Sequence, residues 1–220
     1  MQTERICAVL VFAAVLSAAT WFQHSALLGE LKIKSVEFQG DSLYLLPPML
    51  GRPSVPIAGV PIDTAFFGPL QQVYLETWNW FPLSPEYASV FATYRIKLCD
   101  GYEAYLLRYD SGIGPVLLSV DLFVVHVGEE RLRPPVTVAW SFGDAGWFVD
   151  QAGWLLDVNG DECLDLVRRR KDFEEDVDQA GRGFERLTDD SLTVLLWSQG
   201  SYSAPDLIAD SAWLRRFDFK

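Results

Sequence analysis

The sequence predicts a mainly β protein, built as an antiparallel sheet or β-sandwich and preceded by an N-terminal hydrophobic helix. Several runs alternate apolar and polar residues, an Asp-Gly pair separates two of these runs, and long helical periodicity is missing outside the N-terminus. Of the 220 residues, half are hydrophobic and 14% are aromatic. This composition is sufficient for one good core and excludes a disordered chain.

Residues 1–19 are predicted to be a signal peptide or membrane anchor. Arg5 precedes an apolar run over 6–19, and Ser17 and Ala19 are small residues suited to positions −3 and −1 of a cleavage site. The run is shorter than the ~20 residues of a spanning helix, so a cleaved signal is preferred to an uncleaved anchor, with a buried core helix as a further alternative. We therefore expect a secreted, periplasmic or cell-envelope protein that contacts a membrane only through an uncleaved N-terminus.

Residues 20–70 are predicted to form an N-terminal portion with one strand and one long loop. Residues Leu31–Phe38 alternate apolar and polar side chains, which indicates a half-buried strand. The following stretch, Pro47–Pro69, is rich in proline and glycine. Because each proline removes a backbone donor, we expect a surface loop there and a boundary with the rest of the chain.

Residues 71–220 are predicted to form a β-rich domain. Asp100-Gly101 lies between two alternating runs within 90–109, which is typical of a tight hairpin turn. That turn places Tyr94 on one face with Tyr105 and Leu107. Apolar runs at 116–127 and 136–142 extend the hairpin into an antiparallel meander.

The C-terminal third is predicted to add two short strands on either side of a charged segment. The strands are Leu164–Val167 and Leu192–Trp197, since both are apolar. Between them, residues 172–186 are strongly charged and are expected to include a short helix that ends near Gly181.

The most specific motif is an acidic loop at 157–165. Asp157, Asn159, Asp161 and Asp165 occupy relative positions 1, 3, 5 and 9 between two apolar runs. Oxygen ligands at alternate positions of a tight loop suit Ca²⁺, which takes several oxygens at about 2.3–2.6 Å. Carboxylates this close repel one another unless a cation lies among them. The other interpretation is an acidic surface turn without a metal.

The motif D-V-N-G-D-x-x-x-D-L-V resembles the calcium loop of FG-GAP/VCBS repeats. The resemblance implies carboxylate ligands from Asp157, Asp161 and Asp165, an amide oxygen from Asn159 and the backbone carbonyl of Cys163. It covers fewer than twenty residues of the chain and occurs once, so it does not predict a propeller.

The loop departs from an EF-hand at two positions. The sixth position, usually glycine, is Glu162, and a left-handed turn there costs about 1–2 kcal/mol. The twelfth is Arg168, so the bidentate glutamate of an EF-hand is missing. Cys99 and Cys163 remain if residues 1–19 are removed, and the sequence leaves open whether they form a disulfide.

Several function classes lose support from the sequence. The formal net charge of −12 argues against nucleic acid as a partner. Asp110-Ser111-Gly112 resembles an aspartic protease signature, but the composition is also that of a β-turn, and a second equivalent segment is missing. His126 lies in an apolar run and is expected to be partly buried, and zinc and phosphate-loop motifs are absent from the sequence.

These observations favour an exported, non-catalytic accessory or envelope-associated protein with one Ca²⁺ at Asp157–Asp165. The alternatives are a secreted hydrolase with a carboxylate pair, such as a glycosidase, and a subunit of a larger β assembly. A protein or glycan partner is expected. Trp78 and Trp80 are candidates for an exposed sugar-stacking surface, although most tryptophans are expected in the core.

Overall fold

The computed structural model describes residues 23–46, 59–75, 86–112, 116–144, 146–204 and 211–219. In chain order the elements are helical residues 23–34, β1 (Val36–Glu37), β2 (Ser42–Leu45), β3 (Val60–Pro61), the 3₁₀ helix η1 (Thr64–Phe66), α2 (Phe67–Leu75), β4 (Ser89–Cys99), β5 (Tyr102–Asp110), β6 (Val116–His126), β7 (Val136–Asp144), β8 (Trp147–Leu156), β9 (Asp165–Val177), β10 (Gly183–Ser198), β11 (Ser201–Ser203) and α3 (Ser211–Arg216). The predicted hydrophobic helix at 1–19, Trp78 and Trp80 lie outside these residues. Within the described part of the chain, helices are too short or too polar to cross a lipid bilayer.

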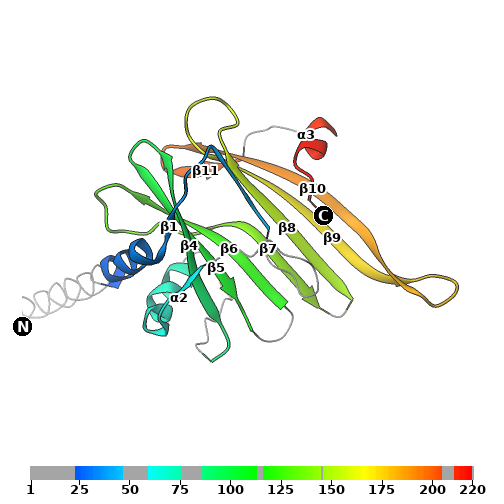
Figure 1. Cartoon of the computed structure of the whole chain (residues 1–220). Helices are drawn as coiled ribbons and strands as arrows, with labels where there is room; N and C mark the ends of the chain where they lie inside the picture. The colour runs from blue at the N-terminus through cyan, green and yellow to red at the C-terminus, as the bar shows by residue number, and fades with distance from the viewer. Residues whose placement is uncertain are drawn as a thin grey trace, which may run out of the picture.

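The described strands form one large sheet (Figure 1). Its order is β1-β4-β5-β6-β7-β8-β9-β10-β11, with β2 paired to β8 and β3 paired to β4. The short β1 runs parallel to β4, and the other pairs are antiparallel. The predicted mainly β class is therefore confirmed, and of the two predicted architectures the strand pairing gives the antiparallel sheet.

The hairpin predicted at Asp100-Gly101 is confirmed, but its register differs from the prediction. Gly101 takes a φ of 77°, a left-handed conformation that glycine adopts without a Cβ penalty. The register shifts between Lys97 and Cys99 and again between Ala92 and Arg95. Each β-bulge inserts one residue and changes the face of the residues that follow. Tyr94 consequently packs in a different cluster from Tyr105 and Leu107.

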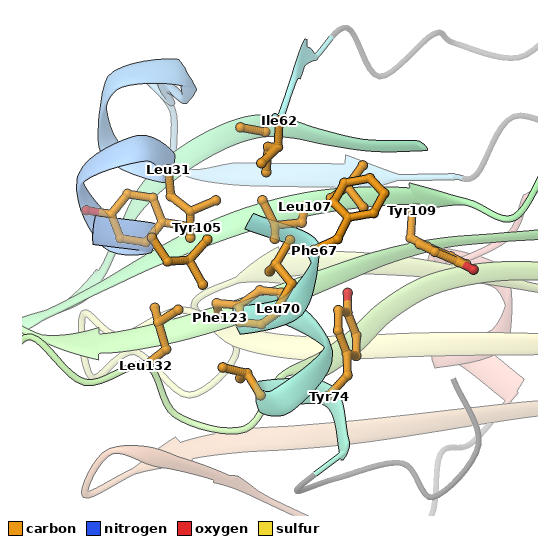
Figure 2. Close-up of a cluster of buried hydrophobic side chains, with 14 of the residues drawn as sticks. Leu31, Ile62, Phe67, Leu70, Tyr74, Tyr105, Leu107, Tyr109, Phe123 and Leu132 are labelled. Carbon is orange, nitrogen blue, oxygen red and sulfur yellow. The ribbon is translucent and has the colours of Figure 1, made fainter. Parts of the chain in front are cut away.

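Two helices cover one face of β4, β5 and β6 (Figure 1). Figure 2 shows Leu31 from the first helix and Phe67, Leu70 and Tyr74 from α2 directed toward Phe123 and its neighbours on the strands. Leu31, Leu70 and Phe123 are fully buried. Burial of an apolar side chain of this size contributes about 1.5–3 kcal/mol, so this helical layer is a large part of the stabilising core.

The strand predicted at Leu31–Phe38 is wrong. Residues 23–34 are helical, and only Val36–Glu37 form a short strand. Leu27 and Leu31, four residues apart, are both fully buried, which is the spacing of one helix face. Ile33, which suggested alternation, is 81% exposed.

The loop predicted at Pro47–Pro69 contains helical structure at its end. Residues 47–58 lie outside the described residues, but η1 and α2 begin before Pro69. The Asp63 side chain accepts a hydrogen bond from Ala65 N at 2.9 Å and so caps η1. Pro69 is the third residue of α2, where its missing N–H leaves no intrahelical bond unmade.

The opposite face of the central strands packs against distant strands of the same sheet. Leu106 of β5 and Leu122 of β6 share a buried cluster with Leu155 of β8, Leu166 of β9 and Trp197 of β10. Neighbouring strands lie about 4.8 Å apart, so side chains four or five strands away meet only when the sheet is strongly curved. Both faces of β5 and β6 are therefore buried by the chain itself.

The short helix predicted within 172–186 is wrong, because these residues form the ends of β9 and β10 and the turn between them. They lie in the long antiparallel hairpin of β9 and β10, in which Glu174 pairs with Arg186. Arg186 Nη2 donates to Glu174 Oε2 at 2.7 Å. Gly181 lies in the connecting turn with a φ of 74°. Opposite charges on the two strands pair across this hairpin. A charged sequence predicts that a segment is exposed, but it does not determine whether the segment is a helix or a strand.

The C-terminal helix α3 is held on β9 by Arg169. This side chain, 7% exposed, donates from Nε and Nη2 to the two carboxylate oxygens of Asp190, both at 2.7 Å. Its Nη1 donates to Leu214 O at 2.6 Å, Phe217 O at 3.2 Å and Asp218 Oδ1 at 2.9 Å. One guanidinium group thus fixes the end of the chain to the sheet.

Candidate functional site

The predicted ligand residues lie in the connection between β8 and β9. Residues 157–164 leave β8 at Leu156 and enter β9 at Asp165. Gly160 and Glu162 take positive φ values of 81° and 66°. The left-handed turn at the sixth position therefore occurs with a glutamate in place of glycine, at a cost of about 1–2 kcal/mol.

Asp157 organises the start of the loop. Its Oδ1 accepts a hydrogen bond from Gly160 N at 2.7 Å, and its Oδ2 accepts one from Glu162 N at 3.0 Å. Partial desolvation raises the pKa of Asp157, but backbone N–H groups of the loop, led by Gly160 and Glu162, outweigh it and lower the pKa below the ordinary value. The ionised carboxylate is therefore the form that the loop favours.

Asn159 and Asp161 repeat the same kind of turn along the loop. Asn159 Oδ1 accepts from Asp161 N at 3.1 Å, and Asp161 Oδ1 accepts from Cys163 N at 2.9 Å. Asn159 Nδ2 also donates to Asp161 Oδ2 at 3.0 Å. Side chains that bond the backbone two residues ahead form Asx-turns, which hold the loop without a metal.

Asp165 lies at the base of the loop and is fully buried. Its Oδ1 accepts from Trp197 N at 2.8 Å, and its Oδ2 accepts from Val158 N at 3.0 Å. Burial raises the pKa of Asp165 above its ordinary value; the two N–H donors oppose this shift, and the charges of Asp161 and Asp157 add to it. Both oxygens of Asp165 thus join β9 to β10 and to the loop.

Cys163 forms a disulfide with Cys99, so of the two states left open by the sequence the structure has the bridged one. The cysteines are 64 residues apart in sequence, and the bond ties the loop to the β4–β5 hairpin. Leu164 N donates to Leu98 O at 2.8 Å, and Tyr202 Oη donates to Leu164 O at 3.0 Å. The C-terminal half of the loop is therefore fixed at three points.

The five predicted ligands lie within 157–165, but each of the four side chains Asp157, Asn159, Asp161 and Asp165 accepts hydrogen bonds from backbone N–H groups. Among the residues that the structure describes, three or more His, Cys, Asp or Glu side chains do not gather in an arrangement that holds a metal ion. Asp157, Asn159 and Asp161 alternate along the turn, and Asp165 is already bonded at both oxygens.

The other sequence candidates have structural roles. Asp110 Oδ1 accepts from Gly112 N at 3.1 Å, which forms an Asx-turn at the end of β5. His126 is partly exposed, with its ring 4.9 Å from the ring of Tyr102 and its Nδ1 3.7 Å from Glu129 Oε1.

The sequence reasoning missed a buried polar cluster around Asp121 of β6. This carboxylate is 2% exposed and accepts hydrogen bonds from Tyr74 Oη at 2.7 Å, Ser119 Oγ at 2.8 Å and Thr137 Oγ1 at 2.7 Å. The signal was present, since Asp121 is a single acid within an apolar strand run and must find buried donors. The cluster joins α2 to the sheet.

A cavity of about 490 Å³ opens beside the β10–β11 turn. Arg131, Arg133 and Trp197 are among its lining residues, and Arg133 Nη1 donates to Gly200 O at 2.8 Å. A Cβ at Gly200 would lie 2.5 Å from Arg133 Nη1, so this contact requires glycine. Among the described lining residues Glu129 is the single carboxylate, so this cavity does not supply the pair that a glycosidase needs.

Comparisons with protein-family models, with curated proteins and with solved structures gave no match.

Proposed function

We propose that this protein is an exported, non-catalytic binding protein whose 157–165 loop binds one Ca²⁺. The observation that carries the proposal is the left-handed conformation of Glu162 at the sixth position, with a φ of 66°. Calcium loops place glycine there to make a sharp turn. Here glutamate makes the same turn, although its Cβ adds backbone strain. The turn keeps Asp157, Asn159 and Asp161 on one short loop.

Within this proposal the ligands contribute unequally. Asp157 and Asp161 supply carboxylate oxygens, Asn159 supplies its amide oxygen and Cys163 its backbone carbonyl. Asp165 contributes least, because it is fully buried whereas Asp157 is exposed, and Trp197 and Val158 donate to both of its oxygens.

We expect the 157–165 loop to bind Ca²⁺ weakly. At the twelfth position, Arg168 donates from Nη1 to Thr137 O at 3.2 Å, so a bidentate carboxylate is absent from that place. Sites with fewer charged ligands belong to extracellular modules, which bind calcium with dissociation constants of about 10⁻⁴–10⁻³ M.

Export is supported by two features. The segment at 1–19 has the composition of a signal peptide. The Cys99–Cys163 disulfide is of the kind that persists in oxidising compartments. In such a compartment calcium is abundant, and its role is to neutralise the loop and stiffen the adjacent surface of β8 and β9.

Thermal unfolding in millimolar CaCl₂ and in excess EGTA tests the proposal. Calcium is expected to raise the melting temperature of the wild-type protein. Asp161→Asn keeps the hydrogen-bond acceptor for Cys163 N but replaces a carboxylate ligand by an uncharged amide oxygen, and it is expected to reduce the increment. Glu86→Ala, at an exposed acid before the start of β4 and at the opposite end of that strand from Cys99, is the control and retains it. Identical wild-type curves in calcium and EGTA would overturn the proposal.

A further inference from the structure

The end of the β9–β10 hairpin projects from the molecule as a two-stranded ribbon (Figure 1). We call residues 172–190 the acidic arm. On one side of β9 the pairing with β8 ends at Trp147 and Glu174. On the far side of β10, among the described strands, only β11 pairs, and only over Leu196–Ser198. The part of β10 within the arm is therefore a sheet edge, with backbone groups available for another strand.

The acidic arm exposes apolar side chains that have no core to enter. Val177 is 67% exposed, Leu187 is 49% exposed and Phe184 is 46% exposed. Val177 and Leu187 lie on one face of the ribbon, because their cross-strand partners are Gly183 and Phe173, and Phe184 lies on the other. A two-stranded ribbon cannot shield such residues from water by itself.

The arm also carries much of the charge of the protein. It contains eight acidic residues and two basic ones, a net charge of −6 out of −12 for the whole chain, and two of these acids, Asp172 and Asp190, are paired with Arg170 and Arg169 outside the arm. Both arginines are already paired within the arm, Arg182 with Asp178 at 2.8 Å and Arg186 with Glu174 at 2.7 Å. A hollow of about 510 Å³ at the end of the arm is lined by Glu175, Asp176, Val177, Gly183, Phe184 and Glu185.

The charge decides which kind of occupant fits this surface. A second copy of the chain would bring another acidic arm and a net charge of −12, so like charges would meet. Nucleic acids and anionic lipid surfaces are repelled for the same reason. A positively charged partner is attracted, and the exposed apolar residues give it points of contact.

We propose that the acidic arm docks an extended basic segment of another protein, which adds as a strand to the free edge of β10. Backbone hydrogen bonds along the edge supply affinity, and alternate side chains supply specificity. Lys or Arg side chains of the segment meet the acids of the arm. The intervening apolar side chains cover Leu187 and Val177 on one face or Phe184 on the other. This role is independent of the calcium proposal, since the arm does not include the 157–165 loop.

A fluorescein-labelled decapeptide in which Lys and Val alternate is the probe, with binding followed by anisotropy in EGTA at about 0.15 M salt. The decisive variant replaces residues 174–186 by Asn-Gly, a turn that joins the paired residues Phe173 and Leu187. Because the rest of the β9–β10 pairing is kept, this variant should fold. We expect saturable binding to the wild type and about tenfold weaker binding to the shortened arm, since five of its eight acids, Val177, Phe184 and half of its β10 edge are lost.

Two controls separate strand addition from general charge attraction. A peptide with the same composition but its Lys and Val in two separate blocks is expected to bind more weakly than the alternating peptide. Val127→Ser, at an exposed apolar residue outside the arm, is expected to bind like the wild type. Hydrogen exchange is expected to slow at 183–195 when the alternating peptide binds.

Equal binding by the wild type and the shortened arm would overturn the proposal. Equal binding of the two peptides would also overturn it. So would a sedimentation experiment in which the wild type self-associates and the shortened arm does not, because the occupant of the arm would then be a second copy.

Discussion

Tyr74 of α2 donates a hydrogen bond from its phenol oxygen to Oδ2 of Asp121 in β6, at 2.7 Å. The two residues are 47 positions apart, and both are almost completely buried. This bond is a polar contact within an otherwise apolar interface, and it fixes where α2 lies on the sheet. A hydrogen bond contributes about 0.5–1.5 kcal/mol to stability, or about 1.5–3 kcal/mol when one partner is ionised.

We therefore predict that Tyr74→Phe lowers the free energy of unfolding by about 1–3 kcal/mol. The substitution keeps the ring and removes only the donor to Asp121. Urea unfolding measures the change. Tyr87→Phe removes a hydroxyl from a side chain that is 51% exposed and is expected to change the stability by less than about 0.5 kcal/mol. Equal effects of the two substitutions would contradict the role given to the Tyr74 hydroxyl.

The same carboxylate predicts a pH dependence. Burial raises the pKa of Asp121 above its ordinary value of 3.8, although hydrogen bonds from Thr137, Tyr74 and Ser119 oppose the shift. The folded protein therefore holds this proton more tightly than the unfolded chain, and the contribution of Asp121 to stability falls as the pH rises above 3.8. Asp121→Asn cannot ionise. We expect the unfolding free energy of the wild type, relative to that of Asp121→Asn, to decrease from pH 3.8 upward. A difference that stays constant or increases with pH would show that the sign is wrong.

Arg169→Ala is predicted to release the C-terminal segment from the sheet. Its guanidinium group bonds Asp190 and three acceptors between Leu214 and Asp218, so its removal leaves buried acceptors unpaired. Because Asp190 and Asp218 are partly exposed, the expected cost is below that of a fully buried ion pair, about 1.5–3 kcal/mol. Chemical denaturation measures the cost, and hydrogen exchange at 211–219 shows the release. Arg215→Ala, in the same helix but exposed, is expected to leave both measurements close to wild type.

Glu162→Gly is predicted to stabilise the protein. Glu162 has a φ of 66°, and removal of its Cβ relieves about 1 kcal/mol of backbone strain. Glu162→Ala removes the charge but keeps the Cβ, so it is the matched control and gains nothing. Melting temperatures in EGTA compare the two. A larger gain for alanine would mean that charge repulsion in the loop, and not the backbone, is the source of the cost.

Reduction of Cys99–Cys163 is predicted to lower the free energy of unfolding by about 2–4 kcal/mol, because the bridge closes a long loop in the unfolded chain. Melting with and without a phosphine reductant measures the loss. The double variant Cys99→Ala/Cys163→Ala is expected to melt at the same temperature under both conditions. A reductant effect that persists in the double variant would have to come from another part of the molecule.

The central hairpin and meander were predictable because their signals are local. Asp100-Gly101 fixes a turn, and the runs at 116–127 and 136–142 became β6 and β7 with small changes at their ends. The bulges in β4 were not predictable, since they depend on which residues of β5 and of the distant strands fill each face. The alternation of apolar and polar residues predicts that Ile96 and Tyr105 share one face. Both are buried, but they enter different clusters.

The errors in the sequence predictions share a physical cause. Lys32, Ile33 and Lys34 mimic strand alternation, whereas the helix there is set by Leu27 and Leu31, which pack on a sheet formed by residues far along the chain. The charged residues 172–186 indicate exposure, but only pairing with a partner strand decides that they are extended.

For the candidate site, the spacing placed the five residues in one loop between two strands. The spacing does not determine whether oxygens face a cation or the N–H groups of the loop. Asp157 and Asp161 show why, since the turn that brings them together also presents backbone donors to both.

The double burial of β5 and β6 has a consequence for recognition. Helices fill one side of these strands and the curved sheet fills the other, so a ligand at the middle of the molecule would have to displace the protein's own side chains. New binding specificity in such a fold is least destabilising when it arises at the edges of the sheet, where a substitution changes what is bound and leaves the packing of the core unchanged.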